Sequence, residues 1–289
     1  SPKDVVVAST GVIGQPLPVK LVEKALPKLG AALSPQGSAH AKAAIMTTDL
    51  LEKEIAVSFS LGDKTCKIGG IAKGSGMIHP NMGTMLAFLT TDVDLSSSML
   101  QKALDTIVPN TFNMVSVDGD TSTNDMAVIL ANGMAGNPAI EEPGPDYDLF
   151  VKALTHVCIY LSRMIAKDGE GATKLLECMV CGAPDEDTAK VLAKSLICSS
   201  LFKAAMFGAD ANWGRVLCAL GYADADFDVS KVKIRFASPA GSVTVCDQGA
   251  GVPFSEEEAK QILLEREIEI IVELFQGEGS AVAWGCDLS

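Results

Sequence analysis

Residues 73–92 have the sequence Lys-Gly-Ser-Gly-Met-Ile-His-Pro-Asn-Met-Gly-Thr-Met-Leu-Ala-Phe-Leu-Thr-Thr-Asp, and the rest of the chain is organised around them. Two flexible glycines and a Pro80-Asn81 turn precede an apolar run, residues 85–89, that is typical of a buried strand. The run begins directly after the Gly83-Thr84 bond. The pattern therefore places one hydroxyl group, that of Thr84, at the mouth of a buried strand.

Thr84 has two interpretations. A β-branched threonine commonly opens a strand, and most Gly-Thr pairs are of this ordinary kind. Alternatively, the Thr84 hydroxyl attacks the Gly83 carbonyl, an ester forms, and water cleaves the ester, so that Thr84 becomes a new N-terminus. The freed α-amino group, with an ordinary pKa of about 8, would then act as general base for the hydroxyl of the same residue.

Composition predicts a soluble globular protein. The chain has 289 residues, 48% hydrophobic and 20% charged, which is enough to bury a large core in one domain or two. The net charge is −13 and there is no long Lys/Arg run, so we expect neither nucleic acid nor a membrane as partner. No run of about 18 uninterrupted apolar residues occurs. Ser1-Pro2-Lys3 leads into an apolar run rather than a signal peptide, so we expect a cytoplasmic location.

The cysteines and histidines show no metal-binding pattern. The eight cysteines lie mostly inside apolar runs, as buried free thiols do. Cys178 and Cys181 have CxxC spacing, but no second CxxC and no histidine pair accompany them, which favours free thiols over a zinc or redox site. His156 falls within a predicted helix and is interpreted as structural. His79, five residues before Thr84, is a candidate for supporting the site.

The first apolar segment, Lys3–Ser9, is predicted to form a buried strand. Such a strand needs a neighbour, so we expect the parent chain to extend upstream. The segment runs into Thr10-Gly11 and a turn punctuated by glycine and proline. Composition alone favours a plain strand-to-helix connection here. The alternative is that Thr10 and Gly11 direct hydrogen-bond donors into a pocket.

Hydrophobic periodicity predicts alternating helices and strands over the rest of the chain. The longer predicted helices cover Val19–Leu33, Pro35–Met46, Ser96–Ile107, Tyr147–Ala166 and Glu186–Met206. The predicted strands include Glu54–Ser60, Thr65–Ile71, Met126–Ala131, Leu175–Cys181, Glu267–Phe275 and Ala281–Asp287. Residues 267–275 alternate apolar with mostly acidic residues, which suits an edge or half-exposed strand. Because the pattern continues on both sides of the loop at 132–144, we expect one unit over 1–289.

Polar residues stand where several of these elements end. Thr47 and Thr48 close an apolar helix and would ordinarily form a cap or a turn. Lys73 precedes Thr84 by 11 residues. A lysine beside glycines is ordinarily a solvated charge, but a fixed positive charge there can also hold a substrate carboxylate. The segment lacks the spacing of a phosphate-binding loop.

Two later segments are also polar. Asp118–Asp125, Asp-Gly-Asp-Thr-Ser-Thr-Asn-Asp, has side chains that suit Ca²⁺, but a glutamate at the twelfth loop position is missing, which argues against an EF-hand. Glu170 stands between glycines in Lys167–Lys174. On spacing alone it would be an exposed turn residue.

The chain resembles the ornithine acetyltransferase (glutamate N-acetyltransferase) family in several stretches, in order and over nearly its whole length. The matching stretches are Thr10-Gly11, Ile45–Asp49, Lys73–Asp92, Asp118–Asp125, Lys167–Lys174 and Phe207–Arg215. Members of that family process themselves at a small residue followed by Thr, in a Lys-Gly-x-Gly-Met…Pro-x-x-x-Thr-Met-Leu setting. Gly83 stands where many members have alanine, a mild departure because glycine crowds the attacked carbonyl less.

The resemblance implies the nucleophile and the oxyanion hole. Thr84 would be the nucleophile, freed by cleavage of the Gly83-Thr84 bond. The hydroxyl of Thr10 and the N–H of Gly11 would stabilise the charge that develops on the attacked carbonyl.

It also implies the substrate-binding residues. Thr47 would contact the amino-acid substrate, although the register leaves Thr48 open as an alternative. Lys73 would hold a carboxylate and Glu170 the amino group of the substrate. Asp118–Asp125 would border the site and brace it by hydrogen bonds.

The implied fold is α/β, with stacked β-sheets flanked by helices, and is not a Rossmann fold. The implied reaction moves the acetyl group of N²-acetylornithine to glutamate through acetyl-Thr84, in a ping-pong cycle without metal or organic cofactor. Acetyl-CoA is a possible second donor, and the processed subunits 1–83 and 84–289 would assemble as a heterotetramer with two copies of each. In the family the chain continues further, and its last residues close over the substrate, so we expect an extension at this end too.

Two other functions stay open at this point. A hydrolase with the same nucleophile, such as an aminopeptidase or amidase relative, would share the Thr84 chemistry but lack an acceptor site, and Lys73 and Glu170 argue against it. A non-catalytic ligand-binding protein, such as an unprocessed fragment, would keep the pocket but not the cut bond.

Overall fold

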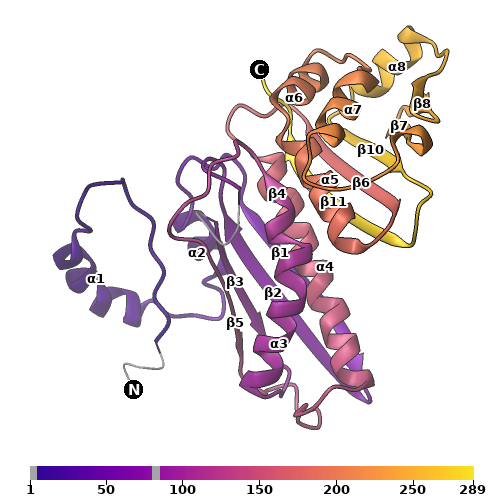
Figure 1. Ribbon diagram of the computed structural model, residues 1–289. Helices are drawn as coiled ribbons and strands as arrows, with labels where there is room; N and C mark the ends of the chain where they lie inside the picture. The colour runs from indigo at the N-terminus through magenta and orange to yellow at the C-terminus, as the bar shows by residue number, and fades with distance from the viewer. Residues whose placement is uncertain (1–4, 80–84) are drawn as a thin grey trace.

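Two β-sheets form the body of the protein, and helices cover and join them (Figure 1). The computed structural model describes residues 5–79 and 85–289. Within these residues the first sheet has four strands in the order β1-β2-β3-β5, which are β1 (Lys53–Leu61), β2 (Lys64–Lys73), β3 (Leu86–Thr91) and β5 (Met126–Ala131).

The second sheet has the strand order β4-β11-β6-β10-β7-β8-β9. Its strands are β4 (Val115–Ser116), β6 (Leu175–Ala183), β7 (Lys233–Ser238), β8 (Gly241–Asp247), β9 (Ala250–Gly251), β10 (Glu267–Glu273) and β11 (Gly279–Cys286). The helices are α1 (Val19–Ala31), α2 (Ser38–Ala44), α3 (Ser97–Ile107), α4 (Pro145–Lys167), α5 (Glu186–Cys198), α6 (Ser200–Phe207), α7 (Trp213–Gly221) and α8 (Glu256–Leu263). This is the α/β fold of stacked sheets and flanking helices that the family resemblance implies.

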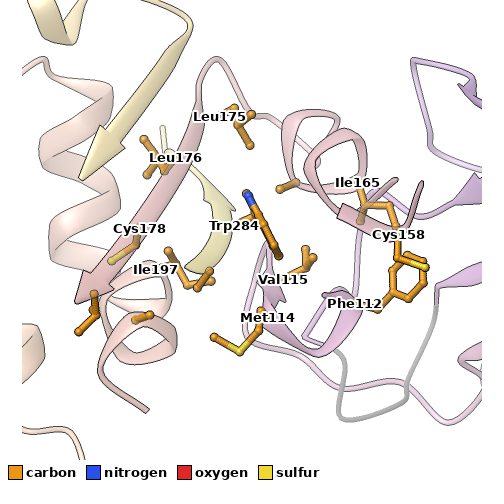
Figure 2. Close-up of a cluster of buried hydrophobic side chains, with 14 of the residues drawn as sticks. Phe112, Met114, Val115, Cys158, Ile165, Leu175, Leu176, Cys178, Ile197 and Trp284 are labelled. Atoms are coloured by element: carbon orange, nitrogen blue, oxygen red, sulfur yellow. The ribbon is translucent and has the colours of Figure 1, made fainter. Parts of the chain in front are cut away.

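Helix α4 joins the two sheets, because it packs against β1 and β2 of the first and against β4, β6 and β11 of the second. By length and hydropathy α4 is apolar enough to cross a membrane, but its apolar stripe is buried in the core. Figure 2 shows part of that core, with Cys158 and Ile165 of α4 and Trp284 of β11 labelled. Gly70 of β2 lets the helix approach closely, since a Cβ there would lie 3.1 Å from the Leu161 side chain.

The first sheet brings together segments on both sides of the stretch 74–85. The predicted strands Glu54–Ser60 and Thr65–Ile71 are confirmed as β1 and β2, which form a hairpin with Gly62 in the left-handed region at φ 58°. Strand β3 then pairs with β2 in antiparallel fashion, with Lys73 opposite Leu86. On its other side β3 pairs in parallel with β5, with Leu86 opposite Met126.

The second half of the chain departs from expectation at two points. The helix predicted over Glu186–Met206 is divided into α5 and α6, because Ser199 leaves the helical conformation and its hydroxyl accepts a hydrogen bond from Phe202 N–H. Strand β10 lies inside the sheet, between β6 and β7, so the prediction of an edge strand at residues 267–275 is wrong. The alternative prediction, a half-exposed strand, is confirmed, since Glu269 is exposed while Ile270 is buried.

The beginning of the chain does not form the predicted buried strand. Residues 5–9 are not in a strand, and Val5, Val6 and Val7 are exposed. A strand needs a hydrogen-bonding neighbour, and none of the strands in the described part of the chain pairs with this segment. Helix α1, which follows, has no buried residue and stands apart from the body in Figure 1.

Candidate active site

The candidate site lies where β2 ends and β3 begins. Lys73 is the last residue of β2, and its pairing with Leu86 places it beside the start of the strand that follows Thr84. Gly83 and Thr84 themselves lie outside the described residues. The site is therefore built from the residues that surround them in the fold.

A buried triad of charges, Asp49–Lys53–Asp168, underlies this region. Lys53 Nζ lies 2.8 Å from an Asp49 carboxylate oxygen and 2.6 Å from an Asp168 carboxylate oxygen. All three side chains are almost completely buried. Two carboxylates at this depth are tolerated because a single ammonium group contacts both of them.

The triad fixes the backbone on which the predicted substrate-binding residues stand. Asp49 accepts hydrogen bonds from Gly74 N–H at 2.6 Å and from Thr47 N–H at 3.1 Å. Burial raises the pKa of Asp49, but the hydrogen bonds from Lys53, Gly74 and Thr47 outweigh it, so the net pKa is lowered and the group stays ionised. Because Gly74 follows Lys73 directly, the same carboxylate holds both Thr47 and Lys73 in place.

The other end of the triad holds Glu170. The backbone carbonyl of Asp168 accepts a hydrogen bond from Ser75 Oγ at 2.6 Å. In return the Glu170 N–H donates to the Ser75 carbonyl at 3.0 Å. The Glu170 carboxylate then lies over Gly76, where an added Cβ would be 2.5 Å from it. A side chain at position 76 would therefore displace the exposed Glu170 carboxylate from this position.

Lys73 is suited to hold an anion. Its side chain is buried, with 3% of its surface exposed. Burial lowers the pKa of Lys73, while Asp49, Asp125 and Glu170 act at longer range to keep it charged. A carboxylate that entered here would meet a buried cation on which the described acids act at longer range.

The segment 116–121 clamps the chain just before residue 80, as predicted for the Asp118–Asp125 stretch. Asp118 accepts hydrogen bonds from Met77 N–H at 2.6 Å and from Ile78 N–H at 3.0 Å. Met77 has a positive φ of 56°, a conformation that needs such support. Thr121 Oγ1 donates to the His79 carbonyl at 3.0 Å. Residues 77–79 are therefore held in one position.

His79 supports this clamp, in keeping with the role predicted for it. Its Nδ1 lies 3.0 Å from Ser116 Oγ and 3.6 Å from Cys198 Sγ. Burial lowers the pKa of His79, with Lys194 acting in the same direction, so the ring is neutral near pH 7. The ring also lines a cavity of about 630 Å³ between this loop and α5.

The structure brings some of the predicted site residues together and leaves others apart. Lys73 and Glu170, together with the backbone of Thr47, are joined through the triad. Thr10 and Gly11 lie on the exposed segment before α1, and among the described residues no hydrogen bond links them to the triad or to Lys73. Their oxyanion role stays a prediction.

Sequence reasoning missed the residues that organise the site. Nothing in the sequence distinguishes Lys53, and Asp168 is visible only as part of a polar turn. The two residues are 115 positions apart, so no spacing rule connects them. Asp125 belongs to a polar stretch, and nothing in the sequence shows that its carboxylate oxygens are buried.

The eight cysteines are free in the structure. Cys178 is completely buried, and burial raises the pKa of its thiol well above the ordinary value. Cys181, the other half of the CxxC pair, is partly buried on the same strand, and burial also raises the pKa of its thiol. Thiols in this state are protonated and unreactive at neutral pH.

Comparison with known proteins identifies close relatives. The family model described as the ArgJ family matches residues 1–289. The chain is 52% identical over 287 residues to the arginine biosynthesis bifunctional protein ArgJ of Caldanaerobacter subterraneus subsp. tengcongensis, which covers 99% of this chain and 71% of that protein. It is also 52% identical over 288 residues to ArgJ 1 of Clostridium acetobutylicum, with 100% of this chain and 71% of that protein covered.

A solved structure agrees with the fold. The crystal structure of the arginine biosynthesis bifunctional protein ArgJ from Bacillus halodurans matches with a TM-score of 0.68 and 45% sequence identity. The match covers 71% of this chain and 95% of that chain.

Proposed function

The chain belongs to the ArgJ family, and from this premise we infer that it transfers the acetyl group of N²-acetyl-L-ornithine to L-glutamate in arginine biosynthesis. The observation that carries the assignment is the match to ArgJ proteins over the whole chain at about half identity. The buried cation of Lys73, held beside Glu170 by the Asp49–Lys53–Asp168 triad, supplies the amino-acid recognition that this reaction needs.

We propose that the chain cleaves itself between Gly83 and Thr84 into subunits 1–83 and 84–289. The length over which the solved ArgJ chain from Bacillus halodurans matches this chain supports the division. The match covers 71% of this chain, which is about 205 of its 289 residues. The same match covers 95% of the solved chain. A product that begins at Thr84 would have 206 residues, 289 minus 83.

The transfer proceeds in two steps at Thr84. In the first, Thr84 Oγ bonds to the acetyl carbonyl carbon and passes its proton to the α-amino group, and the C–N bond breaks as ornithine leaves with a proton. In the second, the deprotonated amine of glutamate attacks the acetyl ester and releases Thr84 Oγ, which regains its proton. Both substrates carry an α-carboxylate, so one anchor, Lys73, serves both steps.

The remaining members of the site have supporting roles. Thr47 contacts the substrate from the turn that Asp49 holds. Thr10 and Gly11 stabilise the oxyanion. Acetyl-CoA is a second donor, which accords with the word bifunctional in the names of the relatives. We further propose a cytoplasmic enzyme that assembles as two copies of each subunit.

The oxyanion role of Thr10 gives a kinetic prediction. Thr10→Ala removes one hydrogen-bond donor from the attacked carbonyl and should lower kcat by roughly 10²–10³-fold. Steady-state rates of ornithine release, measured over a range of acetylornithine concentrations, separate kcat from KM. A rise in KM with kcat intact would assign Thr10 to binding instead.

The anchoring role of Lys73 gives a second prediction. Holding the acceptor amine against the acetyl ester is what makes transfer faster than hydrolysis, an advantage equivalent to an effective molarity of roughly 10⁵ M in favourable cases. Lys73→Met should therefore abolish most of the stimulation of ornithine release by glutamate while sparing slow hydrolysis of acetylornithine.

The control for this experiment is Lys67→Met, because Lys67 is on the same strand but exposed. Ornithine release is assayed with and without glutamate in the wild type and both variants. If glutamate stimulates release as strongly in Lys73→Met as in Lys67→Met, Lys73 does not hold the acceptor.

A further inference from the structure

A cysteine, a histidine and a cavity meet at the end of α5. Cys198 is the last residue of α5, and its Sγ lies 3.6 Å from Nδ1 of His79. The same ring nitrogen lies 3.0 Å from Ser116 Oγ, which helps to fix the ring. Cys198 and His79 both line the cavity of about 630 Å³, and Cys198 also lines a second cavity of about 250 Å³. A small molecule can therefore reach this thiol.

Exposure separates Cys198 from most of the other cysteines. Five of the eight are buried, which leaves Cys181, Cys198 and Cys218 at least partly exposed. Burial still raises the pKa of the Cys181 thiol, and that thiol donates to the Val272 carbonyl. Cys218 is exposed on α7. Cys198 combines partial exposure with contact to an imidazole ring.

The contact between Cys198 and His79 pairs a nucleophile with a base. Burial lowers the pKa of His79, with Lys194 acting in the same direction, so the ring is neutral near pH 7 and can accept a proton. In the tautomer with its proton on Nε2, Nδ1 accepts a hydrogen bond from the Cys198 thiol. Loss of the thiol proton gives the thiolate, which is the reactive form of cysteine.

Positive charge faces the same space from α5. Lys194 stands one turn before Cys198, and the two groups interact electrostatically. Burial lowers the pKa of Lys194 to about 8, so its ammonium group is still mostly charged near pH 7. Lys190 also lines the cavity and pairs with Glu186 at 2.6 Å, whereas the lining acid Asp224 is exposed to solvent. The buried charge of Lys194 therefore favours a negatively charged reagent.

The larger cavity sets the size and polarity of that reagent. Its volume of about 630 Å³ lies in the range of small-molecule sites, roughly 300–1,000 Å³. The side chains of Pro109, Met114 and Val191 give it an apolar lining beside the lysines of α5. A small disulfide that carries carboxylate groups on an aliphatic frame fits this combination.

We propose that Cys198 is a modification site for small disulfides that carry carboxylate groups. The Cys198 thiol passes its proton to His79 Nδ1, and the thiolate attacks one sulfur of the disulfide. A new S–S bond joins that half of the reagent to Cys198 as the old S–S bond breaks. The other half leaves as a thiolate and takes the proton from His79. The disulfide is the oxidant, and a thiol reverses the step.

The modification also lowers acetyl transfer, a part of the inference that rests on the proposed function. A group attached to Cys198 lies in the cavity that His79 and Thr121 line. Thr121 Oγ1 donates to the His79 carbonyl, and Asp118 holds the two residues before His79. A bulky group that moves His79 and Thr121 therefore disturbs the clamp on residues 77–79.

The first test incubates the folded protein with oxidised glutathione and measures mixed disulfides by mass spectrometry of unreduced peptides. Cys198 should be modified roughly tenfold faster than Cys218, because a base and a cation adjoin it, although Cys218 is more exposed. In concentrated urea, where the cavity and the contact with His79 are lost, the two rates should become similar. Equal rates in the folded protein, or a faster reaction at Cys218, would overturn the proposal.

Two variants test the groups around the thiol. His79→Gln removes the base and should slow the modification of Cys198 roughly tenfold or more. Lys194→Met should slow the reaction with oxidised glutathione more than that with cystamine, a disulfide that carries ammonium groups in place of carboxylates. The matched control is Lys102→Met, an exposed lysine of α3, which should change neither rate. A wild-type rate in His79→Gln rejects the base, and an unchanged preference in Lys194→Met rejects the recognition of carboxylates.

Assays of ornithine release test the effect on activity. In the wild type, release should fall in parallel with the modification of Cys198 and return with dithiothreitol. Cys198→Ser, treated in the same way, should keep the rate that it has without oxidised glutathione. Unchanged release from fully modified protein overturns this part of the inference. If the untreated wild type releases no ornithine, the proposed function fails, while the mass measurement still decides whether Cys198 is the modification site.

Discussion

Thr84→Ala should yield a single uncut chain of 289 residues without acetyltransferase activity. The substitution removes the hydroxyl group that is proposed to attack the Gly83 carbonyl and later to carry the acetyl group. Denaturing mass spectrometry reports the cut, and ornithine release from acetylornithine reports the activity. Thr84→Ser, which keeps a hydroxyl, should still cleave but more slowly.

The control for Thr84→Ala is Thr90→Ala, since Thr90 is an exposed threonine of β3. That variant should be cut and active like the wild type. Cleavage of the Thr84→Ala chain at the same bond would show that another residue is the nucleophile. Loss of activity in a chain that is still cut would separate processing from transfer.

Lys53→Met should cause the largest loss of stability of any single change considered for this protein. It leaves the carboxylates of Asp49 and Asp168 buried without their shared cation, which costs about 3–5 kcal/mol in comparable cases. Because the triad also fixes the backbone of Thr47, Lys73 and Glu170, activity should fall with it. Urea unfolding of the variant and of Lys67→Met measures the difference.

A compensating change tests the cause of that loss. Adding Asp168→Asn to Lys53→Met removes one of the two unpaired carboxylates and should recover part of the stability. If the double variant is less stable than Lys53→Met by the full cost of Asp168→Asn alone, the two residues are energetically independent and the triad is not the support of the site.

Much of the first sheet follows from local pattern. Gly62 and the alternating residues on either side of it predict the hairpin that delivers Lys73, and the apolar run after Thr84 predicts β3. These features depend on neighbouring residues only. A helix cap is equally local, because the Ser255 hydroxyl accepts a hydrogen bond from the Glu258 N–H three residues later.

The organisation of the site could not be predicted in this way. The contact of Lys53 with Asp168 joins positions 115 residues apart, and a lysine at the start of a strand is ordinarily solvated. The Asp125 carboxylate oxygens are buried where β5 begins beside β3, and the sequence does not specify this parallel pairing. The chemistry-bearing residue types are visible in the sequence, but which of them meet is decided by the sheet.

In the segment before α1, the sequence predicts a strand that does not form. Residues 5–9 have the β-branched composition of a buried strand, yet they are exposed and unpaired among the described residues. Local propensity states only that a segment fits a sheet, and a strand forms where a partner edge exists. Whether Thr10 and Gly11 reach the attacked carbonyl therefore depends on pairing that their own sequence does not determine.

The central claim is that Thr84 carries the acetyl group between the two substrates. The most direct test mixes the protein with N²-acetylornithine in the absence of glutamate, stops the reaction in acid, and measures the mass of each chain. The claim predicts a fragment with the mass of residues 84–289 plus one acetyl group located on Thr84, and loss of that group when glutamate is added before the acid. An unmodified Thr84 at a time when ornithine has already been released would contradict it.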